Sequence, residues 1–244
     1  MKKERLDKLL VDRGLVQSRE RARALILAGK VLADEQVFDK AGMKIPEDTS
    51  LRIRGEDIPF VSRGGLKLAH ALDEFNVDVH DVVALDVGAS TGGFTDCLLQ
   101  NGAAKVYALD VGYGQLAWKL RQDPRVVCLE RTNIRHLRPE HLAERPSLAV
   151  IDCSFISLTK VLAPTLDLLT ADAEVIALIK PQFELEKGQV GKGGIVRDAR
   201  LQELAIQKVR DFALSLDCLG QGIVESPVLG SKGNREFLIY LVKR

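Results

Sequence analysis

The chain has 244 residues, 46% of them apolar, enough to bury a core in one large domain or in a medium and a small one. Its formal net charge of +1 is unevenly distributed, because residues 1–30 hold nine Lys or Arg against four Asp or Glu and residues 31–60 reverse the balance. No stretch reaches the ~18–20 apolar residues that cross a bilayer, and the charged N-terminus lacks the apolar segment of a signal peptide, so we expect a soluble globular protein with no membrane partner.

The four cysteines, at positions 97, 128, 153 and 218, lie far apart and form no CxxC pair. They predict neither a disulfide framework nor a zinc site, and no metal is expected. This use of cysteine fits a reducing cytoplasm.

Two helices and a short strand are expected near the N-terminus. Leu6, Leu9 and Leu10 recur at helical spacing. A second helix is expected to begin after Ser18 as its N-cap and to end at Gly29. The short strand KVLA follows at residues 30–33.

The second helix is expected to carry a basic edge. Because its apolar positions fix the buried side, Arg19 and Arg23 lie together on the opposite side, with Arg21 and Lys30 nearby. Such clustering can neutralise phosphates. The alternative is that these charges only solvate a surface.

Residues 5–33, RLDKLLVDRGLVQSRERARALILAGKVLA, resemble the RNA-binding module named after ribosomal small-subunit protein four. The order of RLD, GL, SR and a final IxxGxV motif carries the resemblance. The module occurs on ribosomal proteins, pseudouridine synthases and rRNA methyltransferases, so it implies structured RNA without choosing a chemistry. It makes candidate RNA contacts of Arg5, Ser18, Arg19, Arg21 and Lys30, and Arg23 joins them from the basic edge.

Glycine, proline and charge break the periodicity at residues 55–64, GEDIPFVSRG. We therefore expect a small α+β RNA-binding domain at residues 1–58, a linker at 59–64 and a second domain at 65–244.

From residue 81 onward, apolar runs alternate with helical segments. Apolar runs separated by helices indicate a parallel sheet covered on both faces. The predicted fold class is α/β, a Rossmann-like doubly wound sheet preceded by the small α+β domain. Strands are expected near 82–88, 105–112, 126–131, 147–153 and 174–181, helices near 94–102 and 116–123, and one more helix and two strands at the end of the chain.

A glycine-rich loop, LDVGASTGGFTD at residues 85–96, follows the first of these strands. It departs from the dinucleotide fingerprint GxGxxG at Ser90, and GQVGKGG departs from a phosphate loop because Lys192 is followed by glycine. The loop resembles the S-adenosylmethionine loop of methyltransferases, whose backbone groups receive the methionine end of the cofactor. A tight strand-to-helix turn is the alternative. The resemblance implies a cofactor site of Asp86, Gly88, Ser90, Gly92, Gly93 and Phe94.

Two further polar residues follow the next strands. Asp110 ends the strand KVYALD, where a carboxylate can accept hydrogen bonds from ribose hydroxyls. Asn133 follows the strand after it and is expected to meet the adenine edge. Each is also an ordinary polar residue at the end of a strand.

Asp152 and Lys180 end two later strands, SLAVID and EVIALIK. Because both residues stand at the carboxyl ends of predicted parallel strands, we expect both in the crevice at that edge of the sheet. With Lys67 in SRGGLKLAHAL and Glu236 before the last strand, they resemble the Lys-Asp-Lys-Glu tetrad of FtsJ-type ribose 2′-O-methyltransferases.

Together with the first domain, the linker FVSRGG and the run DVGYGQL, these motifs resemble the TlyA family, often labelled haemolysin A, along the whole chain. Asn133 departs from the aspartate that FtsJ relatives usually have there.

A ribose 2′-hydroxyl is a poor nucleophile until it begins to lose its proton. Lys180 is expected to act as the base or to stabilise the alkoxide, with a neutral amine favoured by a second cation, Lys67, and by partial burial. Asp152 is expected to orient Lys180, and Lys67 and Glu236 to position the ribose. The alternative is a structural ion-pair network.

The resemblance therefore implies a cytoplasmic methyltransferase that uses S-adenosyl-L-methionine on ribose 2′-oxygens of structured rRNA, with ribosomal RNA or ribosomal subunits as partners. The alternative is a non-catalytic RNA-binding protein that retains the fold. A membrane-lytic role is not supported, because the sequence has no long apolar segment. The polar segment with four glycines from 188 to 194, and with Lys187, Lys192 and Arg197, is expected to close over RNA or cofactor or to be a plain surface loop.

Overall fold

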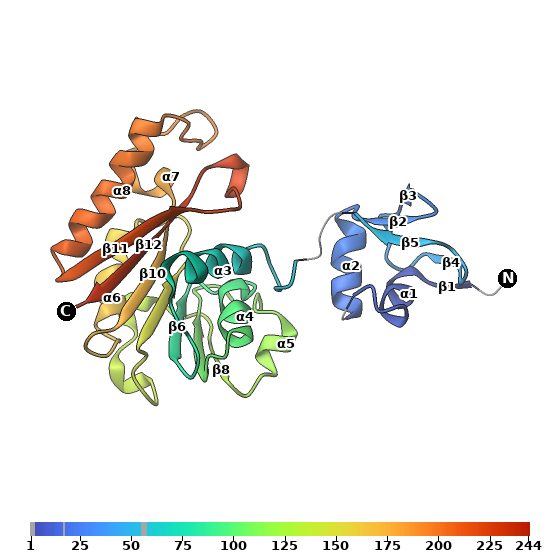
Figure 1. Cartoon of the computed structure of the whole chain (residues 1–244), viewed down its shortest axis with the longest axis horizontal. Coiled ribbons are helices and arrows are strands. Elements are labelled where there is room, and N and C mark those ends of the chain that lie inside the picture. The colour runs from blue at the N-terminus through green and yellow to red at the C-terminus, as the bar shows by residue number, and fades with distance from the viewer. Residues whose placement is uncertain (1–2, 17, 55–57) are drawn as a thin grey trace. The chain divides into compact units, whose positions relative to one another are not determined.

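The computed structural model describes residues 3–16, 18–54 and 58–244. The chain divides into two compact units, Met1–Asp57 and Ile58–Arg244 (Figure 1). No helix in the described part of the chain is long and apolar enough to cross a membrane.

The N-terminal unit packs two helices against short strands. Ser18 is the N-cap of the second helix, since its hydroxyl accepts a hydrogen bond from the Arg21 amide at 3.2 Å, and Gly29, two residues after that helix ends, has a left-handed φ of +65°. Both features confirm the helix limits that the sequence predicts. The elements are β1 (Lys3–Arg5), α1 (Leu6–Asp12), α2 (Arg19–Leu27), β2 (Val31–Ala33), β3 (Gln36–Val37), β4 (Lys44–Pro46) and β5 (Leu51–Ile53).

Two small sheets complete this unit. β1 pairs with β4, and β3, β2 and β5 form a three-stranded sheet in that order, with all pairs antiparallel. Leu6, Leu10 and Ile26 are fully buried between the helices and these strands. The apolar positions thus turn inward and leave the arginines of α2 outside.

The second unit is built on a seven-stranded sheet of order β11-β12-β10-β9-β6-β7-β8. The pairs within β10-β9-β6-β7-β8 are parallel, whereas β12 is antiparallel to both β10 and β11. The strands are β6 (Val83–Val87), β7 (Lys105–Leu109), β8 (Val126–Leu129), β9 (Leu148–Ile151), β10 (Glu174–Ile179), β11 (Cys218–Glu225) and β12 (Phe237–Lys243).

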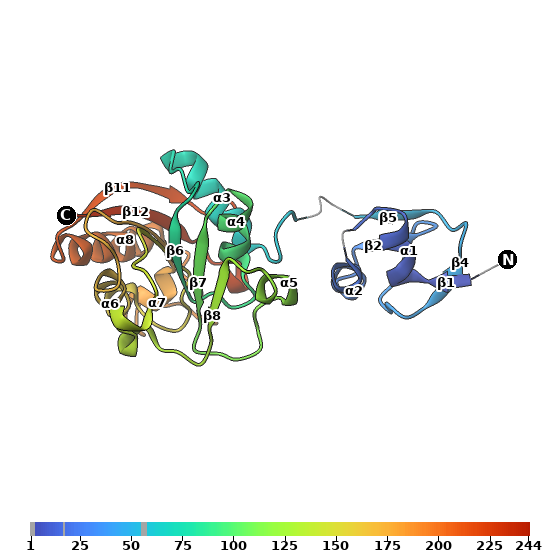
Figure 2. The same cartoon turned by 90° about the horizontal axis from the view of Figure 1, so that it is seen from below.

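Helices cover both faces of this sheet, as Figure 2 shows. Leu85 faces one core with α6 and α8, and Ala84 faces the other with α3 and α4, so successive residues of β6 serve opposite faces. This confirms the predicted doubly wound α/β class. The helices are α3 (Gly64–Phe75), α4 (Gly93–Gln100), α5 (Trp118–Arg121), α6 (Leu162–Leu166), α7 (Pro181–Glu184) and α8 (Ala199–Leu214), with short 3-10 turns at Ile134–His136, Pro139–His141, Leu158–Lys160 and Ser231–Gly233.

The sheet differs from a purely parallel one at β12. Only residues 226–236 join β11 to β12, too few for the crossover that a parallel pair needs, so the last strand turns back. Its antiparallel register pairs Phe237 with Ile179. The first residues of β12 therefore lie at the edge where β10 ends.

Candidate active site

A cavity of about 340 Å³ lies at the carboxyl ends of β6, β9 and β10. Its wall comes from α3, from the loops after these three strands and from the segment before β12. Lys67, Asp152, Lys180 and Glu236 all line it. The structure thus brings together the four residues of the tetrad.

Lys180 and Asp152 form the first ionic contact in the cavity. Their strands are parallel neighbours, and each residue follows its strand by one position. Lys180 Nζ lies 2.5 Å from Asp152 Oδ1 and donates a hydrogen bond to Ser154 Oγ at 2.8 Å. Asp152 Oδ1 is buried and accepts no hydrogen bond from the described residues, so the contact with Lys180 is ionic. Two neighbours thus fix the position of the lysine ammonium.

Lys67 and Glu236 form the second pair. Lys67 Nζ donates to Glu236 Oε2 at 2.6 Å, and their side chains are only 11% and 2% exposed. A Cβ atom at position 230 would overlap the Glu236 carboxylate, so Gly230 leaves the room this carboxylate occupies. Since Phe237 pairs with Ile179, Glu236 reaches the edge of the sheet beside Lys180.

The glycine-rich loop forms another wall of the cavity, with Gly88, Ser90, Gly93 and Phe94 among the lining residues. Gly88 has φ +88°, and a Cβ there would lie 2.7 Å from the Asp152 carbonyl oxygen. Only a residue without a side chain allows this approach.

Gly92 and Gly93 are also close-packing positions. A side chain at Gly92 would overlap Leu116 and Leu120, and one at Gly93 would overlap Ser62. Gly92 does not line the cavity, although Gly93 does.

Most amides of this loop are already engaged. The amides of Gly88 and Ala89 donate to the Leu109 carbonyl, that of Gly92 donates to Ala89 and that of Ser90 donates to Asp110 Oδ2. We expected amides of this loop to face the cofactor, whereas these four amides donate to other groups of the protein.

Asp86 is fully buried at the base of the cavity. Its Oδ2 accepts hydrogen bonds from the amide and the hydroxyl of Thr95, at 2.9 and 2.6 Å. Burial raises the pKa of Asp86 to about 7, against the hydrogen bonds from Thr95. Its Oδ1 is buried and receives no hydrogen bond from the described residues. Thr95 thus satisfies one oxygen of the Asp86 carboxyl, and the other oxygen keeps its hydrogen-bonding capacity unused among the described residues.

Asp110 and Asn133 lie outside the cavity wall. Asp110 accepts hydrogen bonds from the amides of Ser90 and Gly112, at 2.8 and 2.7 Å, and so holds the glycine-rich loop from behind. Asn133 accepts from the Arg135 amide at 3.1 Å and caps a 3-10 turn. Contact of either residue with a cofactor remains a proposal.

Three residues at the site were not predicted from the sequence. Ser154 and Phe183 line the cavity, and Phe155 lies beside them with its ring centroid 5.2 Å from that of Phe183. Phe155 has φ +65° and is 91% exposed, the most exposed large hydrophobic residue in the described chain. Each phenylalanine stands three positions after a tetrad residue, Asp152 or Lys180, and this spacing is the signal that could have found them.

The segment with four glycines is tied to the chain before β12. Asn234 accepts a hydrogen bond from the Val196 amide and donates to the Gly194 carbonyl, both at 2.9 Å. The three basic residues expected to close over a ligand, Lys187, Lys192 and Arg197, are exposed. The end of this loop is thus anchored two residues from Glu236.

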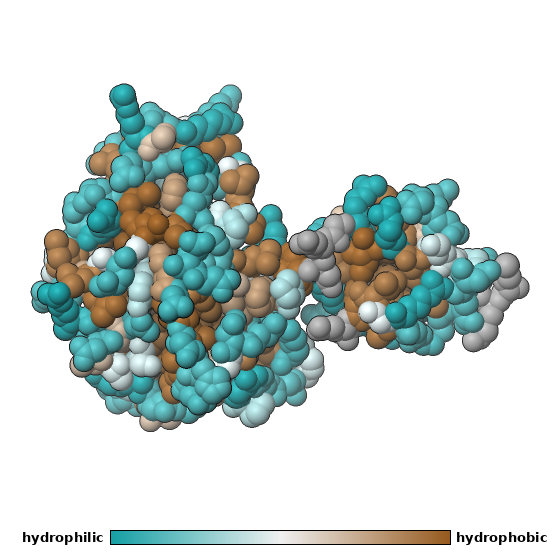
Figure 3. All heavy atoms as spheres, in the orientation of Figure 1, coloured by the Kyte–Doolittle hydropathy of each residue, from teal (hydrophilic) through white to brown (hydrophobic). Residues whose placement is uncertain are grey.

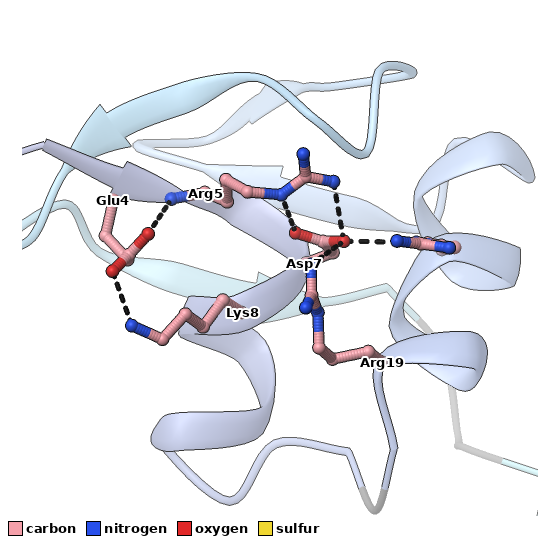
Figure 4. Close-up of polar contacts among 6 residues, drawn as sticks. Glu4, Arg5, Asp7, Lys8 and Arg19 are labelled. Carbon is pink, nitrogen blue, oxygen red and sulfur yellow. Dashed lines mark hydrogen bonds and ion pairs between the residues drawn. The ribbon is translucent and has the colours of Figure 1, made fainter.

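In the N-terminal unit, three of the candidate RNA contacts surround one carboxylate (Figure 4). Arg5, Arg19 and Arg23 all donate to the buried Asp7. The Arg5 hydrogen bonds, with those of the other two arginines, hold the pKa of Asp7 well below its usual range despite its burial.

The other three candidates are placed differently. Ser18 uses its hydroxyl as the cap of α2. Arg21 is half-buried on α2, and Lys30 is half-buried just before β2.

Comparisons with known proteins agree with this architecture. Residues 60–243 match the FtsJ-like methyltransferase model, and residues 4–50 match the S4 domain. The chain is 46% identical over 241 residues to the 16S/23S rRNA (cytidine-2'-O)-methyltransferase TlyA of Mycobacterium tuberculosis, covering 98% of this chain and 90% of that protein. It is 43% identical over 244 residues to Hemolysin A of Brachyspira hyodysenteriae, covering 98% and 99% of the two.

A solved structure of a hemolysin-type protein from Streptococcus thermophilus superposes with a TM-score of 0.78 at 46% identity, covering 100% of this chain and 89% of that one. These relatives confirm the resemblance that the sequence motifs carry. The chain therefore belongs to the FtsJ-like methyltransferase family, within its TlyA (haemolysin A) group, and carries an S4 domain at its N-terminus.

Proposed function

We propose that this protein transfers a methyl group from S-adenosyl-L-methionine to a ribose 2′-oxygen of ribosomal RNA in the cytoplasm. The observation that carries the proposal is the meeting of two ionic pairs, Lys180 with Asp152 and Lys67 with Glu236, in one cavity. The TlyA relative from Mycobacterium tuberculosis is named as a 2'-O-methyltransferase of rRNA cytidines, which supports the same substrate class here.

Asp86, Gly88, Ser90, Gly93 and Phe94 would hold the cofactor, since all five line the cavity. When bound, S-adenosyl-L-methionine supplies an electrophilic methyl group. Asp86 Oδ1 would accept hydrogen bonds from its ammonium. We place Gly92 behind this surface, where it packs against Leu116 and Leu120. Asp110 and Asn133 would meet the adenosine part from outside the described cavity.

Lys180 would act on the ribose hydroxyl. Asp152 and Ser154 fix its Nζ, which as a neutral amine would take the hydroxyl proton and as an ammonium would stabilise the developing alkoxide. Lys67 and Glu236 would position the ribose through their buried pair.

Phe155 and Phe183 would stack on the base of the target nucleotide. An exposed aromatic ring beside the cavity offers a π-face to an unpaired base, and such stacking is the usual way proteins hold single-stranded RNA. We propose that this pair holds the base while the ribose enters the cavity.

Residues 1–58 would act as the RNA-binding domain and residues 65–244 as the methyltransferase domain, joined by 59–64. Arg5, Ser18, Arg19, Arg21, Arg23 and Lys30 remain the candidate RNA contacts. The net positive charge of this first segment supports binding to phosphates.

Transfer of a labelled methyl group to purified ribosomal subunits, followed by mapping of 2′-O-methylated riboses, tests the proposal. We expect incorporation at defined riboses. Cofactor binding in calorimetry without any methyl transfer to either subunit would favour the non-catalytic RNA-binding alternative.

A further inference from the structure

Asp7 joins three arginines that come from two separate elements. Arg5 ends β1, whereas Arg19 and Arg23 lie one turn apart on α2. The Asp7 side chain has no exposed surface, and its four hydrogen bonds with Arg5, Arg19 and Arg23 measure 2.9–3.1 Å. Figure 4 shows these groups converging on the carboxylate.

The arginines remain partly open to solvent. The side chains of Arg5, Arg19 and Arg23 are 38%, 49% and 54% exposed. Asp7 uses Nε and Nη2 of Arg5, Nη2 of Arg19 and Nε of Arg23. Their other guanidinium nitrogens donate no hydrogen bond to the residues that the structure describes, so each arginine keeps donors for a ligand.

Three cations around one anion leave two net positive charges in a fixed arrangement. Free arginine side chains lose conformational freedom when they bind a phosphate, and a residue that orders them beforehand reduces this cost. Guanidinium groups also match phosphate oxygens in geometry, which ordering preserves. The neighbouring cations differ, because Lys8 pairs with Glu4 and Arg52 pairs with Glu35.

We propose that Asp7 is a positioning residue that holds Arg5, Arg19 and Arg23 as one phosphate-binding surface for the RNA backbone. This inference rests on the proposed function, since it takes ribosomal RNA as the ligand. It goes further by naming a buried carboxylate, which repels phosphate at a distance, as a residue that RNA binding requires.

Asp7→Asn in the full-length protein tests whether Asp7 strengthens or weakens the binding of RNA. The substitution raises the local net charge by one, so a surface that attracts RNA only through its potential would bind more tightly. A positioning role gives the opposite result, about tenfold weaker binding to ribosomal RNA with a shallower dependence on salt. Asp12→Asn is the matched control, because Asp12 is exposed on the same helix and its substitution changes the charge equally. Binding of the Asp7 variant that equals or exceeds that of the Asp12 variant would overturn the proposal.

Arg5→Lys is a second variant, for the case in which loss of Asp7 unfolds the N-terminal unit. It keeps every charge but removes the two-nitrogen contact with Asp7. We expect severalfold weaker RNA binding with an unchanged melting temperature, and unchanged binding would contradict the positioning role. Cofactor affinity and methyl transfer by the unsubstituted protein are measured in parallel. If that protein neither binds nor methylates ribosomal RNA, the proposed function fails; if it does both and the variants match it, only the role of Asp7 fails.

Discussion

Lys67 and Glu236 stand 169 positions apart in the chain, yet Lys67 Nζ lies 2.6 Å from Glu236 Oε2 inside the cavity. Both side chains are nearly inaccessible to solvent, so removal of one partner leaves an uncompensated buried charge. We expect Lys67→Met to lower the free energy of unfolding by about 3–5 kcal/mol. The double variant Lys67→Met with Glu236→Leu should regain much of this stability in denaturant titrations while methyl transfer stays lost. Recovery of activity in the double variant would show that the pair is structural only.

Lys180→Ala should reduce methyl transfer by about 10²–10⁴-fold while cofactor and RNA still bind, because the lysine acts chiefly in the transition state. Lys180→Arg keeps the positive charge but cannot accept a proton at working pH. Single-turnover rates on ribosomal subunits separate the two roles of the residue. If the alanine variant is inactive and the arginine variant is active, Lys180 is an electrostatic stabiliser, and the base is Asp152 or water.

Gly88→Ala should abolish cofactor binding, because the new Cβ would press on the Asp152 carbonyl. Gly114→Ala is the control, since Gly114 also has positive φ, at +72°, but has no atom within 4 Å of a Cβ. Both variants carry the backbone strain of roughly 1–2 kcal/mol, so calorimetric cofactor affinity isolates the steric effect. Equal affinities in the two variants would remove Gly88 from the site.

Phe155→Ala should raise the KM for ribosomal RNA about tenfold or more, since stacking on one base contributes roughly 1–3 kcal/mol. The ring is almost fully exposed, so its loss should leave the melting temperature nearly unchanged. Leu214→Ala, at an exposed position ending α8, is the control for removing a hydrophobic side chain from the surface. An unchanged KM in the Phe155 variant would show that the base is held elsewhere.

The buried Asp86 predicts a pH dependence of stability. Its folded pKa of about 7 lies above the ordinary value of 3.8, so folding favours the protonated form. This stabilisation is complete below pH 3.8 and is lost as the pH rises towards 7. Asp86→Asn cannot ionise, and its free energy of unfolding should fall less between pH 4 and 7 than that of the unsubstituted protein. Parallel curves from denaturant titrations across this range would show that Asp86 is ionised throughout.

The positions of Asp152 and Lys180 at the ends of two strands were sufficient to predict where they lie. Parallel strands that end side by side direct the following residues to one edge of the sheet. Lys67 and Glu236 could be connected with them only through the family resemblance. Their contact depends on how α3 packs and on the reversed direction of β12, and neither follows from local periodicity.

Asp7 and Phe155 show what local sequence propensities do not predict. Asp7 has the sequence position of an ordinary acidic residue in the first turn of a helix, and its burial depends on arginines contributed by two other elements. Phe155 has a left-handed backbone conformation that phenylalanine seldom adopts, so no propensity scale predicts it. The surface view in Figure 3 shows hydrophobic residues among hydrophilic ones on both units, so exposure alone would not have singled out this ring.

The reversed direction of β12 has a consequence for how the protein is made. β12 is the last strand in the chain, yet it lies between β10 and β11, and the residue just before it is Glu236. The strand inserts into the sheet only after all the others have been synthesised, so the nascent chain cannot assemble the Lys67–Glu236 pair earlier. In a chain made from its N-terminus onward, Lys67 therefore stays without its carboxylate partner until almost the whole second unit has been synthesised.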